Sequence, residues 1–194
     1  GGALMVANHA GAIPVDAPSI MHGIERELGR PVYGLADDVF KKMPLVNVAW
    51  SRLGGVQAHP DNAYRLLRQQ QHLVMVFPEG SKGPGKLYKE RYQVRRFGRG
   101  GFVQIAMRAG VPIIPLAVIG SEETMPIVAK VPVLDRLLGV PYVPITANML
   151  FGPLGLLVPF PAKQRIRVLD PVVHEVPPDQ PRYPRSRNMG TSAG

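Results

Sequence analysis

Cysteine is missing from this sequence of 194 residues. Its absence excludes disulfide bonds and thiolate metal sites, and it suits a reducing compartment. The sequence also lacks an initiator methionine and a signal peptide, and it begins within an apolar run that is typical of a strand. We therefore expect an upstream segment to be missing from this chain.

Charge is missing from one long stretch, since no charged residue lies between Arg136 and Lys163. The stretch is long enough to cross a bilayer, but its prolines and glycines would leave backbone groups unsatisfied in lipid. We expect residues 137–160 to form a folded apolar flap instead, which either lies in a membrane interface or lines an acyl channel. The alternative interpretation is an ordinary buried core segment.

Several familiar catalytic patterns are also absent. No serine stands in a nucleophile-elbow pattern, and no histidine pair has the spacing of a zinc protease. Residues 80–86 have the glycine and lysine spacing of a phosphate loop, but the next residue is Leu87, which has no hydroxyl to bind magnesium. We therefore expect neither a nucleotide-hydrolysing loop nor a metal site.

The composition that is present indicates a globular, basic protein. Hydrophobic residues make up 45% of the chain, which is enough for one domain with a full core. The net charge of +9 favours an anionic partner, such as nucleic acid, a membrane surface or a phosphate-bearing substrate. We expect residues 1–176 to form the domain and residues 177–194, which lack periodicity, to be a disordered tail.

Apolar periodicity predicts strands that alternate with helices. The clearest buried strand covers residues 73–77, and a second covers 111–119, with Pro112 and Pro115 expected at an edge or end of it. Helices are predicted over residues 17–28, 102–109 and, capped by Asp61, up to residue 68. This order favours an α/β fold with a mixed, partly parallel sheet flanked by helices.

A histidine and an aspartate follow the first strand, at the exit of residues 3–7. His9 can accept a proton from a hydroxyl near neutral pH, and Asp16 can hold the other ring nitrogen and stabilise the imidazolium. Gly11 and Pro14 between them favour a compact turn. The alternative is a structural histidine beside an aspartate that caps a helix.

A second polar turn, residues 79–82, directly follows the strand at 73–77. Ligands of open α/β sheets bind beyond the carboxyl ends of the strands, so we expect Glu79 and His9 at one edge. Gly80 lets the backbone approach a ligand, and Ser81 and Lys82 offer donors to a phosphate. The alternative is an ordinary surface turn.

Basic and aromatic residues alternate over the next segment, residues 82–99. It holds seven basic side chains, among them Lys86, Arg95 and Arg96, against the single acid Glu90. Such a cluster suits the phosphates of a lipid headgroup, of a carrier such as coenzyme A, or of nucleic acid. The alternative is a solvated basic loop.

Three segments together resemble the glycerolipid (lysophospholipid) acyltransferase family: residues 8–16, 77–82 and 111–115, in the family's order. The resemblance covers residues 4–170. It implies transfer of a fatty acyl group from acyl-CoA or acyl carrier protein to a lysophospholipid or glycerolipid hydroxyl at a membrane. It also implies the site residues: His9 as base and Asp16 as its partner, Pro112 and Pro115 beside the acyl donor, and substrate contacts from Asn8, Glu79, Gly80, Ser81, Lys82, Arg95 and Arg96.

The sequence departs from the common family pattern at three places. Six residues separate His9 from Asp16 where four are usual, and Pro14 stands at the usual aspartate position, as in a branch with a longer spacing. Residues 54–60 match the second family motif but lack its phosphate-binding arginine, which leaves a less polar acceptor open. Lys82 replaces the arginine of the third motif, so it keeps the charge and loses the bidentate fork.

We therefore expect an acyl-CoA-dependent, membrane-associated O-acyltransferase on the cytoplasmic side, with the acyl thioester as co-substrate and no further cofactor. His9 would deprotonate the acceptor hydroxyl, which then attacks the thioester directly. Two alternatives stay open: a non-catalytic module that binds lipids or membranes on the same fold, and a nucleic-acid binder that uses the basic and aromatic loop.

Overall fold

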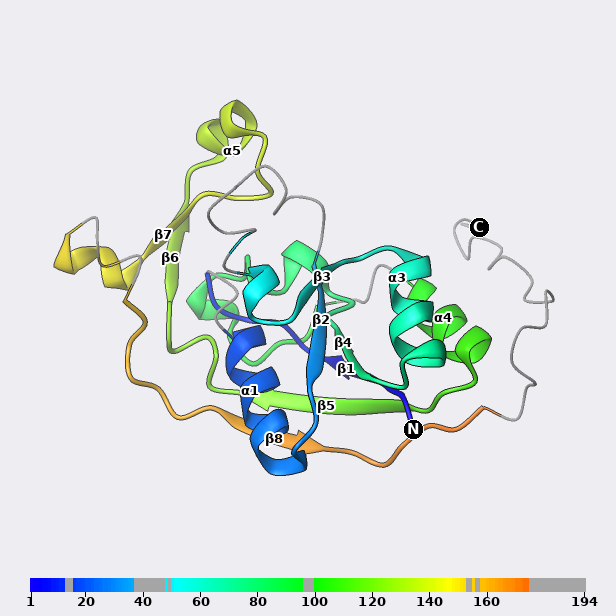
Figure 1. Cartoon of the computed structure of the whole chain (residues 1–194). Helices are drawn as coiled ribbons and strands as arrows, with labels where there is room; N and C mark the ends of the chain where they lie inside the picture. Colours follow the sequence, from blue (N-terminus) through cyan, green and yellow to red (C-terminus); the bar gives the residue numbers. More distant parts are fainter. Residues whose placement is uncertain are drawn as a thin grey trace, which may run out of the picture.

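The computed structural model describes residues 1–12, 16–36, 48, 50–95, 100–152, 155 and 158–174. Its main sheet has the strand order β3-β2-β4-β1-β5-β8, in which the first five strands are parallel and β8 runs antiparallel to β5 (Figure 1). The expected mixed α/β fold is therefore confirmed. The strands are β1 Ala3–Ala7, β2 Val32–Ala36, β3 Gly55–Gln57, β4 Leu73–Val76, β5 Ile113–Ile119 and β8 Arg165–Val168.

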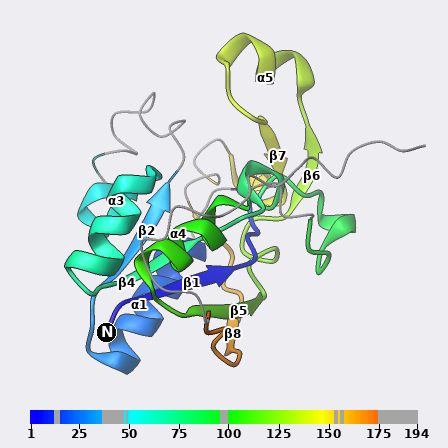
Figure 2. The same ribbon diagram turned by 90° about the vertical axis from the view of Figure 1, so that its right-hand side faces the viewer.

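Helices cover both faces of this sheet (Figures 1 and 2). Helix α1, Asp16–Leu28, packs on the face that carries Met5 and Met75. Leu4 and Val74 belong to the opposite face, which is covered by the π-helical η2 and by α4. Successive side chains of a strand point to opposite faces of the sheet, so each buried strand contributes to the hydrophobic core on both faces. The elements on that second face are α3 Pro60–Tyr64, η2 Arg65–Gln69 and α4 Gly101–Ala109.

A smaller unit stands out from the sheet, and we call residues 127–151 the projection. Strands β6 and β7 pair antiparallel, α5 joins them, and η5 follows β7 (Figures 1 and 2). Two short 3-10 turns, η3 and η4, lie between β4 and α4. The bounds are β6 Ile127–Lys130, α5 Pro132–Leu138, β7 Pro144–Thr146, η5 Ala147–Phe151, η3 Gly80–Lys82 and η4 Tyr88–Glu90.

Individual residues at the helix termini determine where the helices begin and end. Helix α1 ends before Gly29 and α4 before Gly110, and both glycines have a positive φ, of +61° and +64°, which glycine adopts without a steric penalty. The predicted helices at 17–28 and 102–109 are confirmed. The predicted cap at Asp61 is wrong. His59 is the N-cap of α3, because its Nδ1 accepts the Asp61 N–H at 3.3 Å and a proline follows it at the first helical position.

The prolines of β5 differ from the expectation. Pro112 does precede the strand, but Pro115 lies inside it and pairs with Val6 of β1. The carbonyl of Pro115 accepts the Leu169 N–H at 2.9 Å, so its ring nitrogen faces the β8 side, one position beyond the last β5–β8 pair. The hydrogen bond that proline cannot make is therefore lost only where that ladder ends.

The charge-free stretch proves to be partly surface. Leu150 and Phe151 are 87% and 77% exposed, so the ordinary-core interpretation is wrong for this part of it. Within the described ranges, no helix combines the length and apolarity needed to cross a bilayer. Residues 153–154 and 156–157 of the flap lie outside the described residues, and so does the whole predicted tail, residues 177–194.

Candidate active site

Three neighbouring strands, β4, β1 and β5, end at one edge of the sheet and deliver the polar side chains of the site. Strand β1 leads to Asn8 and His9, β4 leads to Phe77 and Glu79, and β5 leads to Glu122. The His9 N–H donates to Glu79 Oε1 at 2.9 Å. The prediction that His9 and Glu79 share one edge is therefore confirmed, as the topology of a parallel sheet requires.

His9 and Asp16 are in direct contact. His9 Nδ1 lies 2.8 Å from Asp16 Oδ2, and the aspartate side chain is fully buried at the first residue of α1. Asp16 also accepts the N–H groups of Ala10 at 3.0 Å and of Ala17 at 2.8 Å. An ionised carboxylate only accepts hydrogen bonds, so Nδ1 carries the proton and Nε2 keeps a basic lone pair.

The ring of His9 is held in orientation on a second side. The Phe77 ring stacks on the imidazole with centroids 4.2 Å apart and planes 24° apart. The His9 side chain keeps 12% of its surface exposed, and no hydrogen bond to Nε2 occurs among the described residues. The arrangement presents one fixed, accessible nitrogen, which is what a general base needs.

Asn8 is engaged with the sheet. Its Nδ2 donates to the Val118 carbonyl at 2.8 Å, and its Oδ1 accepts the Val118 N–H at 2.7 Å. The side chain thus continues the β1–β5 pairing one step beyond the end of β1. Asn8 thus holds the segment before His9 in place, and its predicted substrate contact remains a prediction.

Glu79 is likewise occupied by the protein itself. It is 3% exposed, and its Oε2 accepts the Arg95 N–H at 2.8 Å while Oε1 accepts the His9 N–H. Lys86 Nζ lies 3.9 Å from Oε2. The carboxylate therefore joins the His9 segment to the segment that contains Arg95, while its substrate contact remains a prediction.

Lys86 does not belong to the exposed basic cluster in which the sequence placed it. Its ammonium is buried, lies 3.3 Å from Glu122 Oε1 and donates to the Gln93 carbonyl at 2.8 Å. Glu122 Oε1 also accepts the Tyr92 N–H at 3.2 Å. Sequence reasoning missed Glu122, although its place directly after the strand at 111–119 could have indicated it.

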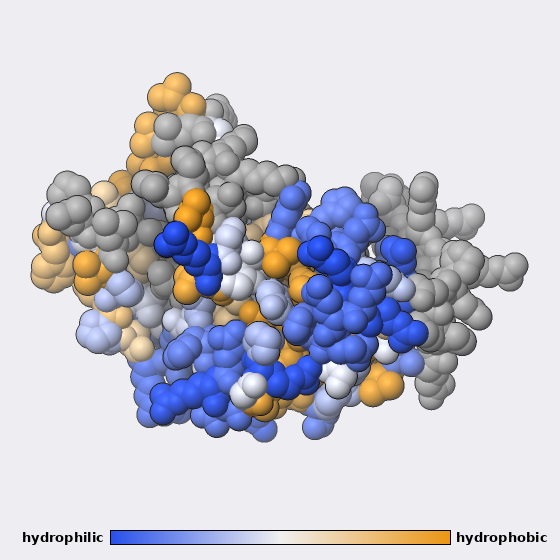
Figure 3. All heavy atoms as spheres, in the orientation of Figure 1, coloured by the Kyte–Doolittle hydropathy of each residue, from blue (hydrophilic) through white to orange (hydrophobic). Residues whose placement is uncertain are grey.

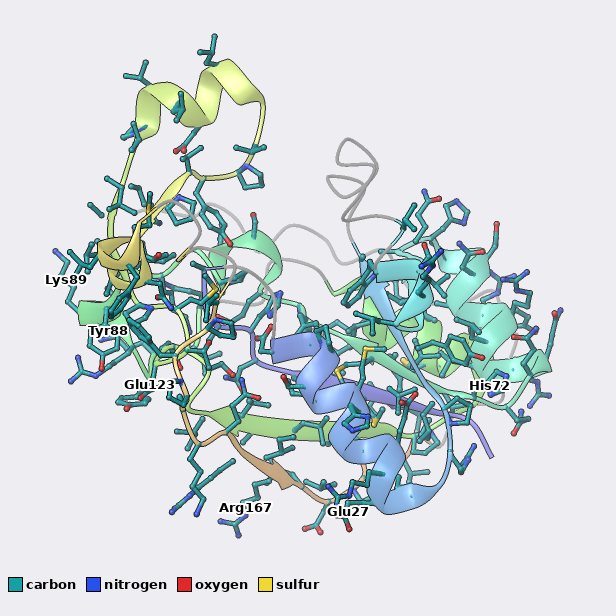
Figure 4. The ribbon with its side chains drawn as sticks, turned by 60° about the vertical axis from the view of Figure 1, so that its left-hand side comes forward. Glu27, His72, Tyr88, Lys89, Glu123 and Arg167 are labelled. Carbon is teal, nitrogen blue, oxygen red and sulfur yellow. The ribbon has the colours of Figure 1, made fainter. Side chains whose placement is uncertain are left out.

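The other cations of the segment divide into paired and exposed ones. Arg95 Nη2 lies 2.6 Å from Glu90 Oε1, and this bond, with the Leu87 N–H, lowers the pKa of Glu90. Lys82 and Lys89 are exposed, and no carboxylate of the described part lies within ion-pair distance of either. Figure 4 shows Lys89 pointing outward at the surface. The predicted contact residue Arg96 lies outside the described residues.

The turn after Glu79 packs closely against the base. Gly80 has φ +57° and carries open space at its α-carbon, as the sequence analysis expected of a residue that lets a ligand approach. Ser81 and Lys82 are exposed. A Cβ on Gly83 would lie 2.6 Å from the His9 carbonyl oxygen. Ser81 and Lys82 directly precede Gly83 and so lie close to His9 in the structure. Their contacts with a phosphate remain a prediction.

Pro112 and Pro115 do not reach this edge. Strand β5 runs parallel to β1, so Pro112 precedes it at the end opposite to His9, where its carbonyl accepts the Leu4 N–H at 3.0 Å. Pro115 lies opposite Val6 within the sheet. Both residues belong to the pairing of β5 with its neighbours, and their place beside an acyl donor remains a prediction.

Tyr142 of the projection contacts the segment of residues 9–12 that follows β1, and the sequence analysis did not predict this contact. Its hydroxyl donates to the Ala12 carbonyl at 2.9 Å. Burial raises the pKa of Tyr142, and the negative charge of Asp16 raises it further, so the phenol stays protonated as a donor. Among the residues that the structure describes, no group of three histidine or acidic side chains could hold a metal ion.

Comparison with known proteins identifies the family and agrees with this fold. The family profile described as "Acyltransferase" matches residues 1–119, more than half of the 194 residues. The chain therefore belongs to the acyltransferase family, and the resemblance to glycerolipid acyltransferases is confirmed. The branch with the longer histidine-to-aspartate spacing remains a prediction.

Two curated relatives match this chain over part of their own length. An uncharacterised protein of Mycobacterium tuberculosis is 44% identical over 175 residues, which cover 89% of this chain and 48% of that protein. The "DGAT1/2-independent enzyme synthesizing storage lipids" of Mus musculus is 32% identical over 59% of this chain and 34% of its own length. The chain thus spans about half the length, or less, of these curated relatives.

The fold itself matches a solved structure. The 1-acyl-sn-glycerophosphate (LPA) acyltransferase PlsC from Thermotoga maritima superposes with a TM-score of 0.52, covers 89% of this chain and 55% of its own, and is 20% identical. This likeness establishes the acyltransferase fold for the chain.

The close approach at Gly83 generates a first prediction. Gly83→Ala places a methyl group 2.6 Å from the His9 carbonyl oxygen and 2.9 Å from His9 Cβ, so the backbone must shift and the base must move. We expect a loss of about 1–3 kcal/mol in unfolding free energy, together with a drop in turnover. Gly101→Ala, which meets nothing within 4 Å, is the control. Equal behaviour of the two variants would contradict the close packing.

Glu79 generates a second prediction. In Glu79→Gln one carboxylate oxygen becomes an NH₂ group that faces a backbone N–H, of either His9 or Arg95, so one hydrogen bond is lost and a buried donor is left unsatisfied. We expect thermal unfolding to show a loss of about 1–3 kcal/mol. Glu123→Gln, at a partly exposed neighbouring acid, is the control. A Glu79 variant as stable as wild type would show that these two bonds do not hold the segment.

Proposed function

We propose that this protein is an O-acyltransferase that moves a fatty acyl group from a thioester, acyl-CoA or acyl carrier protein, to a lysophospholipid or glycerolipid hydroxyl. The site works at a membrane surface on the cytoplasmic side. The observation that carries the proposal is the 2.8 Å contact between His9 Nδ1 and the buried carboxylate of Asp16. A purely lipid-binding module has no need of a histidine held in this way.

The chemistry follows from the tautomer that Asp16 imposes. His9 Nε2 takes the proton of the acceptor hydroxyl as its oxygen attacks the thioester carbonyl, and Asp16 stabilises the imidazolium that forms. When the tetrahedral intermediate collapses, the carbon–sulfur bond breaks, and the imidazolium returns the proton to the leaving thiolate. The product is an ester and a free thiol, and no covalent enzyme intermediate is needed.

The donor side of the site is basic. Lys82 is exposed next to Gly83, whose α-carbon packs on His9, and a cation there is well placed for the phosphates of a thioester carrier. Arg95 is already bonded to Glu90, so its phosphate contact would require exchange of that partner. Lys82 is therefore the first candidate for a phosphate contact.

A neutral acceptor is favoured over a phosphorylated one by two observations. Residues 54–60, which match the second family motif, contain no arginine, and the histidine there, His59, is engaged as the cap of α3 beside the edge strand β3. The mouse relative is named as an enzyme that synthesises storage lipids. We therefore propose a partial glyceride as the preferred acceptor within the glycerolipid class.

The role of His9 is tested by His9→Ala. Loss of a general base lowers turnover by about a hundredfold or more, and we expect that loss in thioester consumption measured by release of free thiol. His22→Ala on α1, a histidine outside the site, is the control. If the His9 variant transfers acyl groups at a near-normal rate, the base is another group and the assignment fails.

The acceptor preference is tested with a panel of neutral and phosphorylated lipids. We expect acyl transfer to monoacylglycerol and diacylglycerol to exceed transfer to lysophosphatidate, measured by lipid chromatography with acyl-CoA and with acyl carrier protein as donors. A reversed preference would show that a phosphate is recognised without the missing arginine, and the neutral acceptor would have to be given up.

A further inference from the structure

The projection exposes an apolar surface that the fold itself does not cover. Side chains on α5 and η5 stand in solvent, and Leu150 and Phe151 are the most prominent pair. Figure 3 shows hydrophobic atoms gathered over these two elements, while much of the same face is hydrophilic. Contiguous apolar surface rimmed by polar residues is typical of an interaction site. The exposed residues used below are Val133, Leu134, Leu137, Met149, Leu150 and Phe151.

Cations lie beside this surface. Lys130 ends β6 and is exposed, with its ammonium 5.9 Å from the centre of the Tyr142 ring. The 3-10 turn η4 lies against β6, and it carries the exposed Lys89, followed by the exposed Arg91. Figure 4 shows Tyr88 and Lys89 on the side of the molecule below α5. Three acids lie nearby: Glu90 is paired with Arg95, Glu123 accepts the Tyr92 hydroxyl, and Asp135 of α5 accepts the Val143 N–H.

The base of the projection is joined to the catalytic turn. Tyr142 donates to the Ala12 carbonyl, and Ala12 packs in one buried cluster with Met125 and Ile127 at the start of β6. The apolar tips and the His9–Asp16 pair therefore belong to one continuous piece of structure.

We propose that the projection is the surface by which this protein docks on an anionic lipid bilayer, with the side chains of α5 and η5 inserted among the acyl chains and Lys89, Arg91 and Lys130 at the headgroups. Apolar insertion with a basic belt is the pattern of interfacial membrane binding. The net charge of +9 complements an anionic surface. The orientation toward His9 rests on the acyltransfer proposed above, but docking is measured without turnover.

The test is flotation of the chain with vesicles of phosphatidylcholine that contain about 30 mol% phosphatidylglycerol. The test variant carries Leu150→Ser and Phe151→Ser, at exposed positions whose replacement leaves the core intact. The matched control carries Val168→Ser and Val173→Ser, two exposed valines at the end of β8 and just after it. Strand β8 and helix α5 lie at opposite ends of the molecule in Figure 1. Thermal unfolding of both variants verifies that they fold.

We expect wild type and control to float equally, and the test variant to lose vesicle partitioning by about tenfold or more. Binding should weaken at about 0.5 M salt, because headgroup attraction is screened there. Wild type that does not float, or a test variant that floats like the control, overturns the proposal. So does a wild type that self-associates through this surface, seen as a dimer in sedimentation that the test variant loses while it keeps its vesicle binding.

Two further measurements separate this inference from the proposed function. His9→Ala should float like wild type, and the Leu150 and Phe151 variant should still consume a short, soluble thioester at the wild-type rate. If floating persists while no acyl transfer by the wild type is found, the docking surface stands and the acyltransfer proposal fails. If acyl transfer is present and the wild type does not float, the docking surface fails alone.

Discussion

The arrangement of the site depends on the hydrogen bonds that the buried carboxylate of Glu79 accepts. It accepts backbone N–H bonds from two segments that are far apart in the chain, at His9 and at Arg95. Desolvating a carboxylate is costly unless its oxygens are satisfied, so the bonds and the nearby Lys86 ammonium make one conformation of both segments strongly preferred. His9, the turn that begins at Gly80 and the segment that leads to Arg95 are held together at this point.

Glu79 and Asn8 together hold the segments that follow the carboxyl ends of the strands in place. Asn8 fixes β1 to β5 just outside the ladder, and Glu79 fixes β1 to the exit of β4. His9 thus lies between two side chains that bond to backbone groups. A histidine held in this way by main-chain bonds keeps its orientation, which the proposed reaction requires.

Sequence reasoning succeeded where the signal was local or topological. The strand at 73–77 and the glycine-terminated helices follow from periodicity and capping, and the shared edge of His9 and Glu79 follows from parallel topology. It failed where long-range partners decide a role. Lys86 looked like one more cation of a basic loop until Glu122, thirty-six residues away, proved to be its partner. Pro115 broke a general rule because the ladder beside it ends at that position. The catalytic roles, the acceptor and the membrane contact remain predictions.

The position of Asp16 at the first residue of α1 has a genetic consequence. Its carboxylate is fixed by the packing of that helix, whose inner face is formed by Ile20, Met21 and Ile24 in the core beneath the sheet. Because a close-packed interior transmits strain, a change in volume at these positions shifts the start of the helix and with it the hydrogen bond between Asp16 and His9. Alleles that abolish turnover in a folded, abundant protein should therefore include substitutions in the hydrophobic core, at residues that touch no substrate.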